Sequence, residues 1–236
     1  MNNQEENNEI QEEKVVYPIF QSFTVNLLIM FSAGFQDAYT YIVRHGVFAN
    51  AQTGNIVLMG TYLLQKDGSQ AIHYLLPLLA FGLGILTSSQ IELNLDKNLG
   101  VAKRLVLILE IISLGIVGFI PDKYFFIANM LVSFSCAMQL QSFRSIKSHA
   151  YASTMCIGNF RSGVDAISNY IHSGEKSSLK NALYYILVVG VFALGAGLGG
   201  NISAVIGIRA IWISVVILII TFIAYSYKLA KKRADQ

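Results

Sequence analysis

The apolar residues of this 236-residue chain come in long runs rather than in the short alternating stretches that build a water-soluble core. An α-helix rises about 1.5 Å per residue, so about 20 residues cross a hydrocarbon core of roughly 30 Å. Six runs reach this length once their flanking residues are counted. They cover residues 19–33, 74–86, 105–120, 124–140, 182–198 and 211–225. The pattern therefore predicts an all-α integral membrane protein with about six transmembrane helices.

Two further segments, residues 53–65 and 158–172, have helical character but are poor candidates to cross a membrane. The first would form a helix of only about 20 Å. The second carries Arg161 and Asp165, and either charge costs about 2.5 to 3.5 kcal/mol at the centre of a spanning helix. We therefore expect two short re-entrant half-helices, which enter the membrane without crossing it.

The positions of Lys and Arg distinguish between ways of threading the chain, because cytoplasmic loops are enriched in these residues. With six spans and cytoplasmic termini, thirteen of the 17 positive residues lie inside and four lie outside, namely Arg44, Lys66, Lys123 and Arg209. Eight spans would divide them nine to eight, which is no bias. Seven spans also give thirteen to four, but only by treating the two similar short segments differently. We therefore prefer six spans.

The chain repeats itself at a distance of about 103 to 111 positions. Each half reads as a spanning helix, a short helix that opens at Gly-Asn, and two further spanning helices. Because each half holds three spans, the second half enters the membrane from the opposite side, which predicts two inverted-topology repeats. The matching segments are residues 33–36 and 136–139, 53–56 and 157–160, 81–84 and 192–195, and 104–105 and 209–210.

The predicted membrane domain covers residues 19–228, with one repeat at about 19–121 and the other at about 122–228. Residues 1–18 read as a disordered, acidic cytoplasmic tail, because they are rich in Glu, Asn and Gln. They do not read as a signal peptide, because they lack its basic start and apolar stretch. Residues 229–236 read as a basic cytoplasmic tail. Only 13% of the residues are charged, about half the usual share of a soluble domain. The positive charges lie at helix ends and in the tail, so no nucleic-acid partner is expected.

The Thr53-Gly54-Asn55 start of the first short helix is the most informative polar motif. Thr53 is a good N-cap, Gly54 permits close approach of a backbone, and Asn55 offers both donors and acceptors. A helix that begins inside a membrane directs unpaired N–H groups at whatever fills the cavity, which suits an anion or a polar solute. Gly158-Asn159 repeats part of the motif. The alternative is that both motifs only cap buried helices and pack the halves together.

Two acidic residues lie within apolar runs, where a charge is costly and a functional role is the first hypothesis. Asp37 lies near the outer end of the first span, and an interfacial ion pair with Arg44 is the alternative. Glu110 lies deeper in its run. It either lines a cytoplasmic vestibule or extends toward the cytoplasmic surface.

Gln36 and Gln139 occupy matching positions of the two repeats. Amides inside apolar helices most often form hydrogen bonds with a neighbouring helix, so packing is the first interpretation and a role along a solute pathway is the second.

No catalytic residue, metal site or cofactor site is predicted, and we do not expect an enzyme. Cys136 and Cys156 form no paired framework or zinc-ligand spacing. The expected partners are membrane lipids and a small polar solute, and the pattern is compatible with a homo-oligomer.

The motifs around the first short helix resemble those of the YoaK family of bacterial multi-pass membrane proteins, a domain of unknown function. The matching residues are Gly34, Asp37, Ala38, Phe48, Gln52, Thr53, Gly54 and Asn55. Glu110 and the segment 137–139 resemble the family's later motifs, whereas Ile157 replaces the second threonine. The resemblance extends over about residues 20–228. It implies a location in the bacterial plasma membrane but no settled activity.

These observations predict a transporter or channel-like permease for a small polar or anionic solute. The alternative is a non-transporting membrane scaffold or assembly factor, in which the same polar groups only hold helices together. An interior cavity that reaches Asn55 and Asn159 favours transport, and dry packing between them favours the scaffold.

Overall fold

A computed structural model describes residues 23–95, 98–143 and 156–234, and every regular element in these ranges is a helix. The predicted N-terminal tail, residues 1–18, lies outside the described residues. The long helices are α2 (Phe23–Val43), α4 (Gly68–Asn94), α5 (Leu99–Val117), α6 (Phe125–Ser142), α8 (Lys176–Ile206) and α9 (Ile211–Ala234). The short ones are α3 (Gln52–Leu64) and α7 (Cys156–Ser173), together with the 3-10 turns η2 (Asp122–Tyr124) and η3 (Gly207–Ala210).

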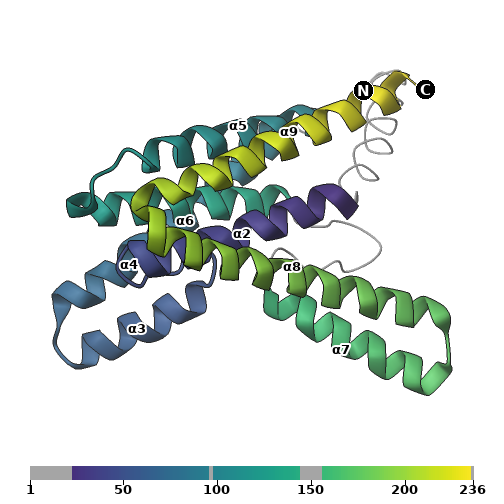
Figure 1. Cartoon of the computed structure of the whole chain (residues 1–236), viewed down its shortest axis with the longest axis horizontal. Coiled ribbons are helices and arrows are strands. Elements are labelled where there is room, and N and C mark those ends of the chain that lie inside the picture. Colours follow the sequence, from purple (N-terminus) through teal and green to yellow (C-terminus); the bar gives the residue numbers. More distant parts are fainter. Residues whose placement is uncertain (1–22, 96–97, 144–155, 235–236) are drawn as a thin grey trace.

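The six long helices form a bundle with two hairpins extending from it (Figure 1). The central helices are α2, which packs against α8 and α9, and α6, which packs against α4 and α5. Helix α5 also packs against α9. Each short helix lies beside the long helix that follows it, α3 beside α4 and α7 beside α8. The two hairpins extend toward opposite ends of the molecule (Figure 1).

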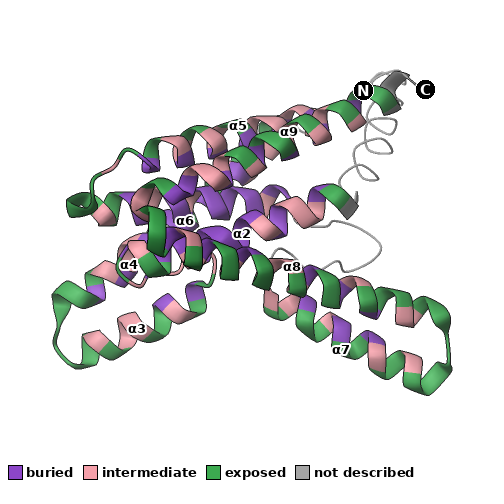
Figure 2. Cartoon of the chain, viewed as in Figure 1, coloured by how far each residue is buried: buried purple, intermediate pink, exposed green. Residues whose placement is uncertain are grey.

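The surface of the bundle is apolar. Leu83 on α4 and Leu194 on α8 are each 57% exposed, as are many other large apolar side chains. Burial is greatest along the central helices and least along the outer faces of the hairpins (Figure 2). Three stretches of the described chain are long and apolar enough to cross a membrane, at Gly68–Asn94, Asp122–Ser142 and Lys176–Lys231. The last of these contains both α8 and most of α9. The described chain is therefore all-helical, with helices long and apolar enough for a membrane protein.

Glycines allow the closest helix contacts. A Cβ atom added at Gly195 of α8 would lie 2.2 Å from the carbonyl oxygen of Phe31 on α2. A Cβ atom added at Gly84 of α4 would lie 2.3 Å from the carbonyl oxygen of Phe134 on α6. Small residues let helix backbones approach in this way inside membranes, and these contacts hold α8 on α2 and α4 on α6.

The two short segments are helices at the predicted places, but the predicted N-cap is wrong. Helix α3 begins at Gln52, and its N-cap is Ala51 with no capping side chain. Thr53 therefore lies inside the first turn. At the other end of the chain, α9 continues to Ala234, so most of the predicted basic tail is helical.

Candidate functional site

The loop between α2 and α3 folds back into the bundle and is held there by two side chains from the start of α3. The amide of Asn55 accepts a hydrogen bond from the backbone N–H of Phe48 (3.1 Å) and donates one to its carbonyl oxygen (2.7 Å). It also donates to Oε1 of Gln52 (2.9 Å), and Gln52 in turn donates to the carbonyl oxygen of Ala49 (2.8 Å). Gly54 accommodates the Phe48 ring, because a Cβ atom there would lie 2.9 Å from it. Asn55 is thus a structural residue of this loop.

Asp37 meets the same loop from the side of α2. Its carboxylate Oδ1 accepts a hydrogen bond from the backbone N–H of Asn50 at 2.6 Å, and the residue is only 6% exposed. A hydrogen bond from a backbone N–H to a carboxylate is stronger than one between neutral groups. The carboxylate therefore satisfies a backbone donor just before the first turn of α3.

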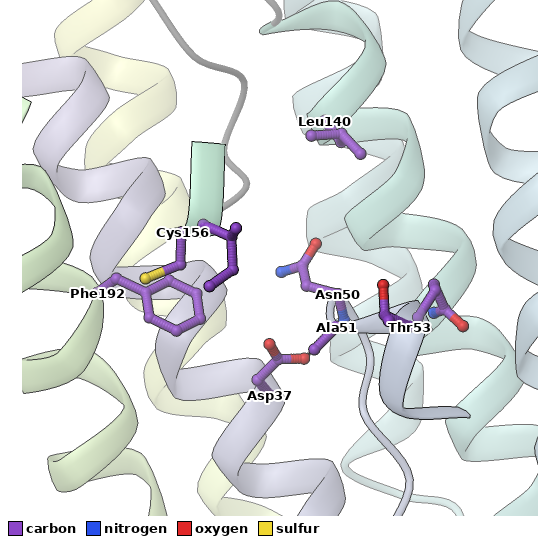
Figure 3. Close-up of a pocket in the computed structure, with 9 residues that line it drawn as sticks. Asp37, Asn50, Ala51, Thr53, Leu140, Cys156 and Phe192 are labelled. Carbon is purple, nitrogen blue, oxygen red and sulfur yellow. The ribbon is translucent and has the colours of Figure 1, made fainter. Parts of the chain in front are cut away.

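A cavity of about 210 Å³ lies where the two short helices begin (Figure 3). Gln52 and Thr53 open α3, and Cys156 and Ile157 open α7. The starts of two segments about a hundred positions apart in the chain therefore meet at one cavity. Its lining residues are Asp37, Asn50, Ala51, Gln52, Thr53, Leu140, Cys156, Ile157 and Phe192.

The wall of the cavity is divided into a polar and an apolar side. The polar groups come from α2, the loop and α3, with Asp37, Asn50 and Thr53 among them. The residues from α6, α7 and α8 are mainly apolar and include Leu140 and Phe192, which lie at different edges of the cavity (Figure 3). The amide nitrogen of Asn50 is buried and has no hydrogen-bond partner among the described residues. One side of the cavity thus carries a carboxylate and, beside it, a buried amide nitrogen without a partner among the described residues.

A second polar region lies among α2, α5, α6 and α9, and we call it the buried amide cluster. At its centre is Glu110, which is fully buried. The amide nitrogen of Gln139 donates to both carboxylate oxygens of Glu110 at 2.9 Å, and that of Gln36 approaches Oε1 at 3.4 Å. Its remaining members are Ser32, Cys136 and Ser214.

The remaining members of the cluster complete its hydrogen bonding around Gln36. The amide nitrogen of Gln36 donates to the hydroxyls of Ser32 (2.9 Å) and Ser214 (3.0 Å), which also contact each other at 2.7 Å. The thiol of Cys136 donates to Oε1 of Gln36 at 2.9 Å. The packing interpretation of the two glutamines therefore describes this region. Glu110 neither lines a vestibule nor extends to the surface, because these amides enclose it.

Arg44 does not pair with Asp37, so the interfacial ion pair considered for Asp37 is wrong. The guanidinium is fully buried and donates to the carbonyl oxygens of Val117 (3.0 Å) and Ile120 (2.9 Å) at the end of α5. A cation at a helix C-terminus satisfies orphan carbonyls and complements the helix dipole. The arginine therefore caps α5.

The structure divides the predicted site residues into three groups. Asp37 and Thr53 line the cavity, whereas Gln36, Glu110 and Gln139 form the buried amide cluster. Gly54, Asn55, Gly158 and Asn159 do not line the cavity; Asn159 is buried, and Gly158 is partly exposed. The expectation that a cavity would reach Asn55 and Asn159, which would favour transport, is therefore not met at these two residues.

Sequence reasoning missed several cavity residues, of which Asn50, Cys156 and Phe192 are the most informative. Asn50 had a usable signal, because it lies in the polar loop directly before the Gln52-Thr53-Gly54-Asn55 motif. Phe192 had none, since it is one aromatic residue in a long apolar helix.

Comparison with known proteins identifies the family but not the activity. The model of the family DUF1275, described as a protein of unknown function, matches residues 25–224. YoaK is a member of this family of membrane proteins, so the predicted resemblance is confirmed. Neither a curated protein nor a solved structure matches the chain. On this match, which covers most of its length, the chain belongs to the DUF1275 family.

Proposed function

We propose that this protein is a plasma-membrane permease, either a transporter or a channel-like protein, in which two inverted repeats move a small polar solute past the starts of α3 and α7. The observation that carries the proposal is the 210 Å³ cavity lined by the first residues of both short helices and by the buried acid Asp37.

The helix contacts support the inverted repeats. If α2 corresponds to α6, α3 to α7, α4 to α8 and α5 to α9, the main helix contacts of one half have counterparts in the other, whereas the weaker contact of α4 with α5 has no comparable equivalent between α8 and α9 in the described part of the chain. The pair α2 and α8 corresponds to α6 and α4, and the pair α2 and α9 corresponds to α6 and α5. The hairpins of α3 with α4 and of α7 with α8 correspond as well. A simple chain of helices packed in sequence order would lack this exchange between halves.

Individual residues follow the same correspondence. Phe31 and Phe134 lie 103 positions apart, and Gly84 and Gly195 lie 111 apart, as the sequence repeat requires. Each glycine contacts the carbonyl oxygen of the phenylalanine of the other half at almost the same distance, 2.3 and 2.2 Å from an added Cβ atom. The helices α3 and α7 also begin 104 positions apart, at Gln52 and Cys156.

The same arrangement supports six spans with cytoplasmic termini. Helices α3 and α7 run outward from the centre of the bundle toward opposite ends (Figure 1). Their 13 and 18 residues correspond to about 20 and 27 Å of helix, less than the roughly 30 Å of a full crossing. A helix of this length that starts near the middle of the bilayer reaches one face, and we assign each to the face from which its preceding loop enters, as in a re-entrant half-helix.

The threading can be tested by labelling from the two sides of the membrane. Lys66 follows α3 and Lys176 opens α8. In spheroplasts, an impermeant thiol reagent is expected to label Lys66→Cys from outside and to reach Lys176→Cys only after permeabilisation. Outside labelling of position 176 contradicts the six-span arrangement.

The size and lining of the cavity support solute binding rather than an accidental void. An engineered apolar cavity of about 150 Å³ is large enough to bind benzene, and polar cavities of sufficient size hold water or ligand. The present cavity is larger and carries a buried carboxylate. Irregular backbone at membrane depth, such as the loop before α3, is also typical of solute pathways in transporters.

Uptake profiling tests the proposal. Three strains are compared: one lacking the gene, one complemented with the unaltered gene, and one complemented with Asp37→Asn. We expect at least one small polar compound whose uptake falls in the deletion strain and is restored only by the unaltered protein. Equal uptake of every compound by the three strains contradicts the permease.

The second candidate is a non-transporting scaffold, and the buried amide cluster favours it. Its amides and carboxylate are bonded across four helices, which is an arrangement that fixes helix positions. The two candidates differ in what Asp37→Asn does. In a scaffold, this change alters stability or assembly, and uptake is unaffected.

A further inference from the structure

We infer that the cavity between α3 and α7 binds a small, electrically neutral, amphipathic solute with a hydrogen-bond donor and acceptor side by side, such as a primary amide or an alcohol. The inference rests on the proposed function and specifies the class of solute. Its support comes from the charge balance, the polar groups and the two unlike walls of the cavity.

The charges at the cavity cancel. A helix N-terminus is equivalent to about +0.5 elementary charge, and the first residues of both α3 and α7 line the cavity. Two such ends offset the single negative charge of the Asp37 carboxylate. The hydrogen bond from the Asn50 backbone N–H to this carboxyl group stabilises the ionised form. An added anion or cation would leave an uncompensated charge in a mostly apolar space, which is costly.

The polar groups of the wall select a solute with both kinds of hydrogen-bonding group. The carboxylate of Asp37 accepts hydrogen bonds, and the amide nitrogen of Asn50 is a buried donor without a partner among the residues described. Figure 3 shows these two side chains next to each other at one side of the cavity. A primary amide or a hydroxyl group can donate to the carboxylate and, once the Asn50 side chain turns its buried nitrogen toward the cavity, accept from that nitrogen. A simple ammonium ion offers donors only, and a carboxylate offers acceptors only.

Where the first repeat places polar residues at the cavity, the second repeat places apolar ones. Asp37 corresponds to Leu140 at a distance of 103 positions, and Thr53 corresponds to Ile157 at a distance of 104. All four residues line the cavity. A solute therefore meets hydrogen-bonding groups from the first repeat and an apolar surface, including Phe192, from the second. This difference fits a molecule with one polar end and one aliphatic side, bound in a single orientation.

Three probes of nearly equal shape test the charge requirement: isobutyramide, isobutyrate and isobutyramidinium. They have the same carbon skeleton and carry no charge, a negative charge and a positive charge. Binding is measured calorimetrically to the full-length protein in lipid nanodiscs near neutral pH. The amide is expected to bind about tenfold or more tightly than either ion, a difference of about 1.4 kcal/mol. Equal or tighter binding of an ion, or no binding of any probe, overturns the inference.

Two substitutions change the charge at the cavity in opposite directions. Because either variant can test the inference alone, a folding defect in one of them does not prevent the test. Asp37→Asn leaves the two helix ends uncompensated, so isobutyrate is expected to become the tightest of the three probes. Leu140→Asp adds a second carboxylate, so isobutyramidinium is expected to become the tightest. An unchanged order of affinities in whichever folded variant is measured contradicts the inference.

Flux in reconstituted vesicles separates this inference from the proposed function. Selective binding of the amide without any flux supports the neutral-solute site and contradicts the permease. Protein-dependent flux of either ion in preference to the amide supports a permease and overturns the inference about its solute.

Discussion

The two buried polar regions of the bundle differ in how fully their side chains are bonded. In the buried amide cluster, Glu110 lies between two glutamine amides, and the four helices that contribute side chains leave the carboxylate no exposed surface. At the cavity, Asp37 also accepts a hydrogen bond, but it faces open space, and the neighbouring Asn50 amide has an unused donor.

This difference separates polar groups that hold helices together from polar groups that can meet a solute. Both regions look alike in the sequence, because each places an acid inside an apolar helix. A fully bonded network rigidifies a bundle, whereas an unused donor beside a cavity is costly unless something binds there. The following predictions test whether the two regions differ in this way.

The largest effect is expected in the cluster. Glu110→Ala removes the carboxylate that accepts hydrogen bonds from the Gln139 amide and that the Gln36 amide approaches. It also leaves a void. Orphaned buried donors and a new cavity together cost about 3 kcal/mol or more. The free energy of unfolding in detergent micelles measures the loss. Ile112→Ala, on the same helix but 53% exposed, is the control and should change little. Equal losses in the two variants would mean that the cluster does not stabilise the bundle.

Substitution of the glycines at the helix contacts is expected to give the second-largest loss of stability, and the loss should be equal in the two repeats. Gly84→Ala and Gly195→Ala each place a Cβ atom against a backbone carbonyl, and overpacking of this kind costs about 1 to 3 kcal/mol. Gly82→Ala and Gly197→Ala lie on the same two helices with no atom within 4 Å of the added Cβ, and they should be neutral. Thermal unfolding of the four variants provides the comparison. A loss in only one of Gly84→Ala and Gly195→Ala would contradict the equivalence of the halves.

Asn55→Ala is expected to destabilise the loop before α3. The change removes two hydrogen bonds to Phe48 and one to Gln52, and the loss should be about 1 to 3 kcal/mol. Limited proteolysis of the loop and the melting temperature measure it. An Asn55→Ala protein that melts normally but no longer binds solute would assign Asn55 to the site instead of the loop.

Asp37→Asn is expected to have the smallest effect on stability and the largest effect on function. The amide oxygen of asparagine can still accept the hydrogen bond from Asn50, so the free energy of unfolding should change by about 1 kcal/mol or less. Solute binding and uptake should be lost, because the charge balance of the cavity has changed. Melting temperature and uptake are measured on the same reconstituted samples. Early melting together with normal uptake would favour the scaffold.

The sequence predicted the helices better than it predicted the site. Long apolar runs identified the long helices, and the Gly-Asn repeat located the starts of the two short helices to within two residues. Asp37 was predicted as an acid in an apolar helix and Thr53 as an N-cap, which it is not, although both residues line the cavity. The sequence did not predict that Asp37 lines a cavity whereas Glu110 is enclosed by amides, because this depends on which side chains meet across helices. Pairs such as Gln36 and Ser214, 178 positions apart, become neighbours only through tertiary packing, which the local pattern does not encode.

The protein carries one native cysteine in each region, so the comparison can be measured directly. Cys156 lines the cavity, whereas the thiol of Cys136 is 1% exposed and bonded to Gln36 in the buried amide cluster. Single-cysteine proteins are made by Cys136→Ala and Cys156→Ser, and modification by a small water-soluble methanethiosulfonate is followed by mass spectrometry in nanodiscs. Rapid modification of Cys156, slowed by a bound solute, with no modification of folded Cys136, is the predicted result. A Cys156 thiol as inert as that of Cys136 would contradict a water-accessible solute site between α3 and α7.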